Sequence, residues 1–127
     1  MAIDIEKLYQ DYGEAWASYD LDKILNFYTD DCVYEDLPSK TTCRSKNELK
    51  EYFSTTLETI PDITFELISS FSSENMLCAE YFIKGTIGGG SGEKSDSDIK
   101  ISIRTASIYE LKGGKFSGVR NYYDRGA

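Results

Sequence analysis

The order of its sequence patterns predicts an α+β domain in which three N-terminal helices pack on a curved antiparallel sheet. Apolar residues follow helical spacing in the first half of the chain and strand-type alternation in the second half. The sequence contains neither a strand–helix–strand alternation nor a glycine-rich phosphate loop, which excludes the parallel nucleotide-binding folds. The length of 127 residues suits a single domain over residues 1–127.

Two helices are expected before the first strand. Residues 4–19 place apolar and aromatic side chains three and four apart, which is typical of an amphipathic helix with one inward face. Asp20 is a suitable N-cap for a second, short helix, whose apolar side is expected to include Tyr28. The Asp30-Asp31 pair is expected to cap the junction between this helix and the following strand.

A short strand over residues 32–36 precedes the third helix, and Pro38 closes it. Ser45 and Glu48 have the spacing of a capping box, so the third helix is expected to begin there and to stop before Pro61. This segment completes the predicted helical half of the domain.

The second half of the chain reads as strands joined by turns. The predicted strands cover residues 63–67, 76–86, 99–111 and 115–124. Gly113-Gly114 is expected to form the last hairpin turn. The segment Gly88–Asp98 is too rich in glycine and serine to pack, so we expect it to be a mobile hairpin loop.

Composition excludes several classes of function. A net charge of −8 without a Lys/Arg cluster argues against nucleic acid as a partner. No apolar run approaches the length of a membrane span, and the N-terminus does not resemble a signal peptide, so we expect a cytoplasmic protein. Cys32, Cys43 and Cys78 lack metal-type spacing and are expected to be buried free thiols.

The chain contains no histidine. Histidine-dependent nucleophiles, zinc sites and acid/base pairs are therefore excluded, and we expect neither a metal nor a cofactor. Proton transfer would depend on Asp, Glu, Tyr, Lys or Cys. Ten Tyr, six Phe and one Trp give the chain an unusual aromatic content; tyrosine suits the wall of a cavity that is both apolar and able to form hydrogen bonds.

Two segments resemble a known family. The stretch AWASYDLDKILNFYTDDCVYEDLP and the C-terminal GGKFSGVRNYYD are similar to the nuclear-transport-factor-2-like superfamily, in particular its ketosteroid-isomerase and SnoaL-like polyketide cyclase branches. The resemblance implies a cone-shaped domain that encloses a pocket for a small apolar molecule, and a homodimer that covers the open face of the sheet.

The same resemblance implies roles for two residues. Tyr12 falls on the tyrosine that donates a hydrogen bond to the substrate's oxyanion in ketosteroid isomerases, and Asp36 falls on their general base. A carboxylate that removes a proton next to a carbonyl, with a phenol to stabilise the enolate, suits a dry pocket. The mechanism is a worked example in enzymology and is taken here from the resemblance.

Two further positions concern the late strands. The segment Arg104–Ser107 corresponds to the site of a second oxyanion donor, an aspartic acid, but contains no carboxylate; Thr105 and Ser107 are its remaining hydrogen-bonding residues. SnoaL-like proteins carry an acid/base aspartate in the last strand, and Asp124 falls there. By the period of two, Arg120, Tyr122 and Asp124 share one face, which enters the pocket if that face is the inner one and no bulge intervenes.

The sequence thus leaves two hypotheses open. The first is a cofactor-independent isomerase, cyclase or dehydratase, with Asp36, Tyr12 and Asp124 as catalytic residues. Its expected ligand-binding residues are Trp16, Tyr34, Phe53, Arg120 and Tyr122. The second is a non-catalytic ligand-binding or association module of the same fold. In that case Asp36 caps a turn and Tyr12 is a core residue.

Overall fold

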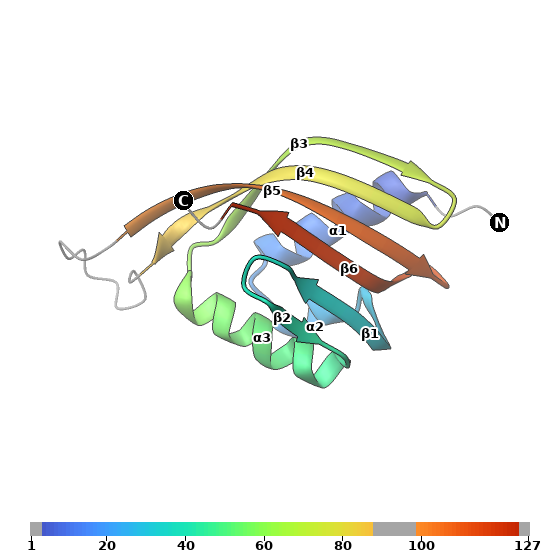
Figure 1. Cartoon of the computed structure of the whole chain (residues 1–127), viewed down its shortest axis with the longest axis horizontal. Helices are drawn as coiled ribbons and strands as arrows, with labels where there is room; N and C mark the ends of the chain where they lie inside the picture. Colours follow the sequence, from blue (N-terminus) through green and yellow to red (C-terminus); the bar gives the residue numbers. More distant parts are fainter. Residues whose placement is uncertain (1–3, 88–98, 125–127) are drawn as a thin grey trace.

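The computed structural model describes residues 4–87 and 99–124. The predicted loop Gly88–Asp98 lies outside the described residues. Two helices precede the first strand, and a third helix follows the second strand. A six-stranded sheet forms the rest of the molecule (Figure 1). The predicted α+β class with helices packed on a curved sheet is therefore confirmed.

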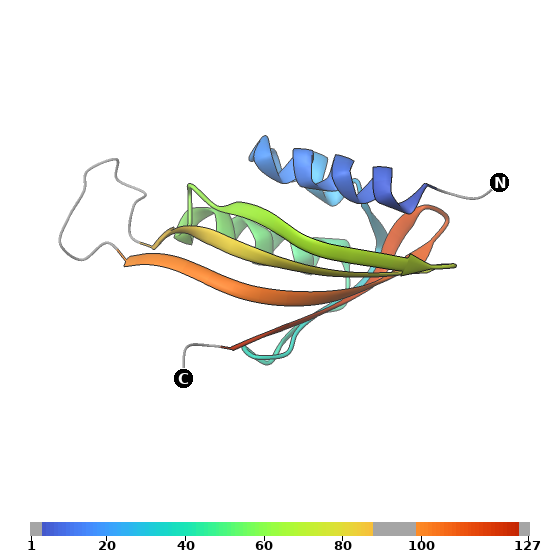
Figure 2. The same ribbon diagram turned by 90° about the horizontal axis from the view of Figure 1, so that it is seen from above.

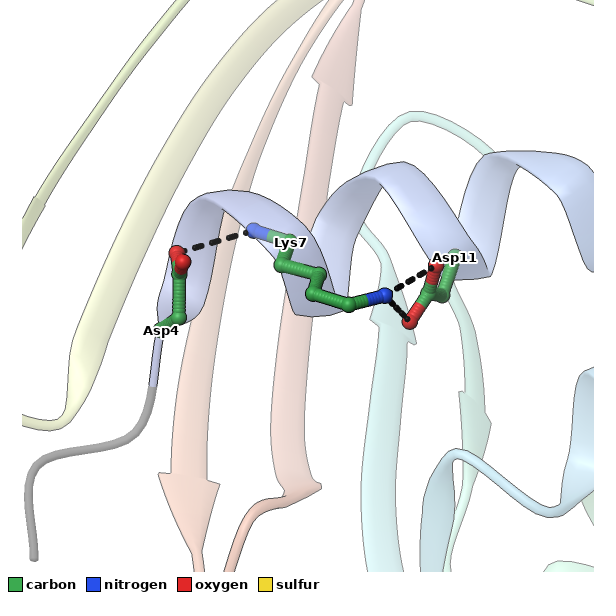
Figure 3. A network of polar contacts seen from close by, with 3 residues as sticks. All are labelled: Asp4, Lys7 and Asp11. Carbon is green, nitrogen blue, oxygen red and sulfur yellow. Dashed lines mark hydrogen bonds and ion pairs between the residues drawn. The ribbon is translucent and has the colours of Figure 1, made fainter.

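Helix α1 spans Ile5–Ala17. The side chain of Asp4 caps it by accepting a hydrogen bond from the Lys7 backbone N–H (3.1 Å), and Lys7 Nζ pairs with Asp11 one turn later (3.0 Å; Figure 3). These contacts are exposed, so the helix is held mainly by its buried face, which carries Tyr12 and Trp16.

The other two helices begin where the sequence predicts. Helix α2 (Leu21–Leu25) is capped by Asp20, and α3 (Lys46–Thr59) is capped by Ser45, whose hydroxyl accepts from the Glu48 N–H. The prediction that Tyr28 belongs to the second helix is wrong, because Tyr28 is fully buried as the first residue of β1.

The sheet consists of β1 (Tyr28–Asp36), β2 (Thr41–Cys43), β3 (Thr64–Ser73), β4 (Met76–Ile87), β5 (Ile99–Lys112) and β6 (Lys115–Tyr123). Its order is β2-β1-β6-β5-β4-β3. The prediction of an antiparallel sheet is wrong at one place, since β1 pairs with β6 in parallel. The long connection from β1 to β6 permits this direction, whereas tight hairpins force neighbours to be antiparallel.

The first strand also starts earlier than predicted. It includes Asp30 and Asp31, which the sequence assigned to a cap. Asp30 instead lies in the strand and forms an ion pair with Lys46 (3.4 Å). The Gly113-Gly114 turn is confirmed: both glycines have positive φ (60° and 80°), which a two-residue hairpin turn of this kind requires.

Aromatic side chains bind the layers together. Figure 2 shows α1 lying along one face of the sheet. We call this the inner face and the opposite one the outer face. Under α1 the Tyr12 ring lies 4.9 Å from Phe116, between ring centroids, and α3 packs on β1 through Phe53, 5.2 Å from Tyr34. Phe116 is fully buried at the centre of this cluster, and the apolar surface that it removes from water stabilises the fold.

Cys32 and Cys43 are buried free thiols as predicted, and Cys78 is half-buried. Burial raises the pKa of the Cys43 thiol to about 11, so this thiol stays protonated at neutral pH.

Within the described residues, no helix combines the length and apolarity needed to cross a lipid bilayer. Nor do His, Cys, Asp or Glu side chains gather there in a group of three or more that could hold a metal.

Candidate functional site

A cavity of about 730 Å³ lies between α1, α3 and the inner face of the sheet. Its wall is mostly aromatic and aliphatic; the aromatic side chains include Tyr9, Tyr12, Trp16, Tyr34, Tyr52 and Phe53. Two carboxylates, those of Glu6 and Asp36, also line the cavity, and no described Lys or Arg does. A volume of this size suits a small organic ligand.

Asp36 ends β1 and is 5% exposed. Its Oδ2 accepts hydrogen bonds from the hydroxyls of Tyr52 (2.7 Å) and Tyr123 (2.9 Å), and its Oδ1 accepts a long one from the Ser39 N–H (3.4 Å). No ion pair to Asp36 occurs among the described residues. A buried carboxylate requires hydrogen-bond donors to replace the water molecules that it loses on burial. Both phenols donate to the same oxygen, Oδ2.

Tyr12 also lines the cavity, and its hydroxyl is hydrogen-bonded to that of Tyr28. Tyr28 is fully buried and is not part of the cavity wall. We therefore assign Tyr28 as the donor, because the opposite direction would leave its own proton buried without an acceptor. The proton of Tyr12 is then available to a ligand.

Burial keeps the Tyr12 phenol protonated. Desolvation raises its pKa well above the ordinary value, and the hydrogen bond from Tyr28 lowers it by a smaller amount. Tyr12 can therefore act as a hydrogen-bond donor at neutral pH, while Asp36 supplies an acceptor on the same cavity wall.

A second polar network crosses the inner face of the sheet. The Tyr81 hydroxyl lies 2.7 Å from Ser107 Oγ, Ser107 Oγ donates to Asn121 Oδ1 (2.6 Å), and Asn121 Nδ2 donates to the Tyr34 hydroxyl (2.6 Å). Strand pairing aligns Asp36, Asn121 and Ser107 in one row over β1, β6 and β5. Every link in this network is uncharged.

The late-strand segment contains Thr105 and Ser107 as buried polar residues. Ser107 uses its only proton in the bond to Asn121, so it has none to offer a ligand. Thr105 lines the cavity, but its hydroxyl donates to the Ile103 carbonyl oxygen (3.3 Å).

Five of the eight predicted site residues line the cavity. They are Tyr12, Trp16, Tyr34, Asp36 and Phe53. The rings of Trp16 and Phe53 contact each other at 5.0 Å between centroids, which joins α1 to α3.

Three predicted residues are not part of the cavity wall. Arg120 lies on the outer face and pairs with Glu110 (3.2 Å), Tyr122 is 44% exposed, and Asp124 is exposed. These residues were expected to enter the pocket if no bulge intervened, and a bulge does intervene. Ser117 is an extra residue in β6, since Leu111 pairs with Phe116 while Glu110 pairs with Gly118. Such a bulge reverses which residues face inward.

The bulge brings Asn121 and Tyr123 into the cavity instead. Sequence reasoning missed both, together with Tyr52, whose hydroxyl also binds Asp36. For Tyr52 a signal existed, because Leu49, Tyr52 and Phe53 have the three- and four-residue spacing of one apolar helix face. For Asn121 and Tyr123 the strand period alone pointed to the wrong side.

Comparison with models of protein families identifies the family of the chain. The model of the SnoaL-like domain matches residues 9–119. The chain belongs to the SnoaL-like domain family. No curated protein sequence matches it.

Solved structures share the fold at low sequence identity. A hypothetical protein with a ketosteroid isomerase-like fold from Catenulispora acidiphila, in complex with trimethylamine, has a TM-score of 0.79 at 14% identity, over 93% of this chain and 85% of that one. A protein from Shewanella denitrificans, provisionally described as a SnoaL-like polyketide cyclase, has a TM-score of 0.80 at 15% identity, over 94% and 89%.

An NTF2-like protein of unknown function from Burkholderia xenovorans has a TM-score of 0.71 at 20% identity, over 97% of this chain and 84% of that one. At these identities the likeness shows the fold alone. The predicted resemblance to SnoaL-like proteins is confirmed by the family model, and the predicted nuclear-transport-factor-2-like fold is confirmed by the solved structures.

Proposed function

We propose that this SnoaL-like protein catalyses a cofactor-independent isomerisation or cyclisation of a small, apolar carbonyl compound. The observation that carries the proposal is the pairing of Asp36 and Tyr12 in one largely apolar cavity, where the carboxylate has no cationic partner among the described residues. Such a site offers an acceptor for a carbon-bound proton and a donor for the oxygen on which charge develops.

The reaction proceeds in two proton transfers. The Asp36 carboxylate removes a proton from the carbon next to the carbonyl, and the electron pair of that C–H bond moves into an enolate whose negative charge rests on oxygen. Tyr12 donates a hydrogen bond to this oxygen. The protonated Asp36 then returns its proton to another carbon of the conjugated system. In a cyclisation the enolate carbon instead attacks a second carbonyl carbon of the same molecule, the π pair of that C=O bond moves onto its oxygen, and Asp36 returns its proton to this oxygen.

The cavity wall supports an uncharged substrate. Aromatic and aliphatic side chains form most of it, and no described Lys or Arg side chain is there to bind a phosphate or carboxylate group. The Catenulispora relative in complex with trimethylamine supports binding of a small organic molecule, and the Shewanella relative described as a polyketide cyclase supports a carbonyl-rich substrate.

One observation favours a second candidate, a ligand-binding module without catalysis. Tyr52 and Tyr123 already donate to Oδ2 of Asp36, so this oxygen has fewer free lone pairs with which to take a carbon-bound proton. In this alternative Asp36 orients a ligand that donates a hydrogen bond and removes no proton.

Deuterium exchange separates the two candidates. A panel of cyclic enones is incubated in D₂O with wild type, Asp36→Asn and Glu35→Gln, and exchange at the carbon next to the carbonyl is followed by NMR. Glu35 is the neighbouring carboxylate on the opposite face of β1 and provides the matched control. We expect Asp36→Asn to lower the exchange rate about 10²- to 10⁴-fold and Glu35→Gln to leave it unchanged. Equal exchange by Asp36→Asn and wild type would remove Asp36 from the mechanism and favour the binding module.

We further propose that the protein is a homodimer that buries the outer face of the sheet. Phe71 (73% exposed) and Tyr122 (44% exposed) lie there, and on that face Phe82 contacts the charged groups of Lys84 and Arg104. Exposed apolar area of this kind supports association. Light scattering should give twice the chain mass of 14.4 kDa, whereas a single 14.4 kDa species would contradict the dimer.

A further inference from the structure

The network on the inner face has a definite direction. Ser107 donates its only proton to Asn121 Oδ1, so it must accept the proton of Tyr81 at its own oxygen. Asn121 then donates from Nδ2 to the hydroxyl oxygen of Tyr34 (2.6 Å). The hydrogen bonds therefore run from Tyr81 through Ser107 and Asn121 to Tyr34.

Tyr34 is the last member of this series. Its oxygen accepts from Asn121, and the proton of its hydroxyl has no acceptor among the hydrogen bonds described for it. Tyr34 lines the cavity, two residues before Asp36 on the same face of β1. A phenol that accepts one hydrogen bond becomes a better donor of its own proton.

The surroundings of Tyr34 favour the protonated phenol. Burial raises its pKa well above the ordinary value, and the nearby phenols of Tyr12, Tyr81 and Tyr52 raise it further, with a small opposing effect of Asn121. Both rings contact that of Tyr28, at 5.9 Å from Tyr12 and 6.3 Å from Tyr34 between centroids, so the two phenols lie in one region of the cavity. Tyr12 receives a hydrogen bond from Tyr28, and Tyr34 receives one from Asn121.

We propose that Tyr34 is a second hydrogen-bond donor to the ligand's oxygen, acting beside Tyr12 and in place of the carboxylic acid that residues 104–107 lack. This inference rests on the proposed function, because it assumes an oxygen on which negative charge develops. The ligand class that it names is a carbonyl compound whose enolate oxygen accepts two hydrogen bonds from phenols. Tyr81, Ser107 and Asn121 are positioning residues, since they act through Tyr34.

The test uses 4-nitrophenol, whose phenolate carries charge on oxygen as an enolate does and absorbs visible light. Its shape-matched control is 4-nitrotoluene, which has no oxygen at that position. All variants are made in the Asp36→Asn background, which represents the neutral state of Asp36 after it has taken a proton. Dissociation constants for both probes are measured with Tyr34→Phe, Tyr12→Phe and Tyr122→Phe, the last being the same change at an exposed site on the outer face.

We expect Tyr34→Phe to weaken binding of 4-nitrophenolate about 10- to 100-fold and to leave 4-nitrotoluene binding within about twofold. Tyr122→Phe should change neither. The proposal is overturned if Tyr34→Phe behaves like Tyr122→Phe, or if it weakens both probes equally, since an equal loss would mean that Tyr34 only shapes the cavity.

Two further variants keep the outcome decisive. If circular dichroism shows that Tyr34→Phe does not fold, Ser107→Ala takes its place, because it keeps the Tyr34 hydroxyl but removes the hydrogen bond that orients Asn121. We expect Ser107→Ala to weaken binding of 4-nitrophenolate several-fold and to leave 4-nitrotoluene binding unchanged. Unchanged binding of 4-nitrophenolate would overturn the proposal. Tyr12→Phe separates this inference from the proposed function. A loss with Tyr12→Phe but not with Tyr34→Phe leaves the proposed function standing and removes only Tyr34, whereas no loss with either variant contradicts both.

Discussion

The inner and outer faces of the sheet alternate along the same strands, yet their polar residues are stabilised in different ways. On the inner face Ser107 and Asn121 are buried and bonded by uncharged partners. On the outer face Arg104 and Arg120 form ion pairs with glutamates in contact with water. Because unpaired polar groups are costly only where water is excluded, we expect the inner face to tolerate change far less than the outer face.

Alkaline pH should show the largest difference. Burial raises the pKa of Tyr12, Tyr28, Tyr81 and Tyr109 above the value of about 10 that a phenol has in the unfolded chain. The unfolded chain therefore loses these protons first, so their contribution to stability is complete below about pH 10 and is lost as the pH rises above it.

Each buried phenol of this kind, Tyr34 included, lowers the free energy of unfolding by roughly 1.4 kcal/mol per pH unit above pH 10, so their effects add. Urea titrations from about pH 8 to pH 11 measure this loss. Tyr81→Phe has one buried phenol fewer, so its free energy of unfolding should fall less steeply with pH than that of wild type. A free energy of unfolding that is constant up to about pH 11 would contradict the burial of these side chains.

The second largest effect concerns the aromatic core. Phe116→Ala removes a ring that is fully buried against Tyr12 and Tyr109, and we expect a loss of about 3–5 kcal/mol in the free energy of unfolding. Phe71→Ala, at a ring that is 73% exposed on the outer face, is the matched control, with an expected change of about 0.5 kcal/mol or less in dilute protein. Similar losses for both variants would remove the distinction between the faces.

Polar substitutions should also cost more stability on the inner face than on the outer face, but the losses should be smaller than those in the aromatic core. Ser107→Ala leaves Asn121 Oδ1 and the Tyr81 hydroxyl without their partner, and we expect a loss of about 1–3 kcal/mol. Ser102→Ala changes an exposed serine on the outer side of the same strand and should have an effect within about 0.5 kcal/mol. Thermal unfolding of both variants measures the pair, and a negligible cost at Ser107 would contradict the buried network.

The smallest effect is expected at Arg120. Its ion pair with Glu110 lies on the outer face, where the two side chains are 31% and 49% exposed. Such pairs contribute about 0–1 kcal/mol, so Arg120→Gln should change stability by less than about 1 kcal/mol and should leave 4-nitrophenol binding unchanged. A large loss of binding would instead mean that Arg120 contacts the ligand.

The fold and half of the site could be predicted because local signals specify them. Asp20 and Ser45 begin helices through hydrogen bonds to backbone groups within three residues, and such contacts are visible in sequence. The pairing of Tyr12 with Asp36 came from the resemblance to a family rather than from spacing alone.

The remainder depends on contacts between distant strands. The bulge at Ser117 decides that Asn121 and Tyr123 enter the cavity while Arg120 and Tyr122 do not. Gly118 beside it is a local signal of a bulge, but it does not specify which residue of the strand is the extra one. The parallel pairing of β1 with β6 likewise joins segments more than eighty residues apart. Long-range register of this kind is set by packing, which the period of a strand does not specify.

The proposed reaction requires that Asp36 and Tyr12 act on one ligand. A double-mutant cycle of deuterium exchange with Asp36→Asn, Tyr12→Phe and the combined variant tests this directly. Residues that act in the same step are not additive, so the combined variant should exchange about as slowly as the slower single variant. Two independent losses that multiply in the combined variant, or a single variant that exchanges at the wild-type rate, would contradict the account.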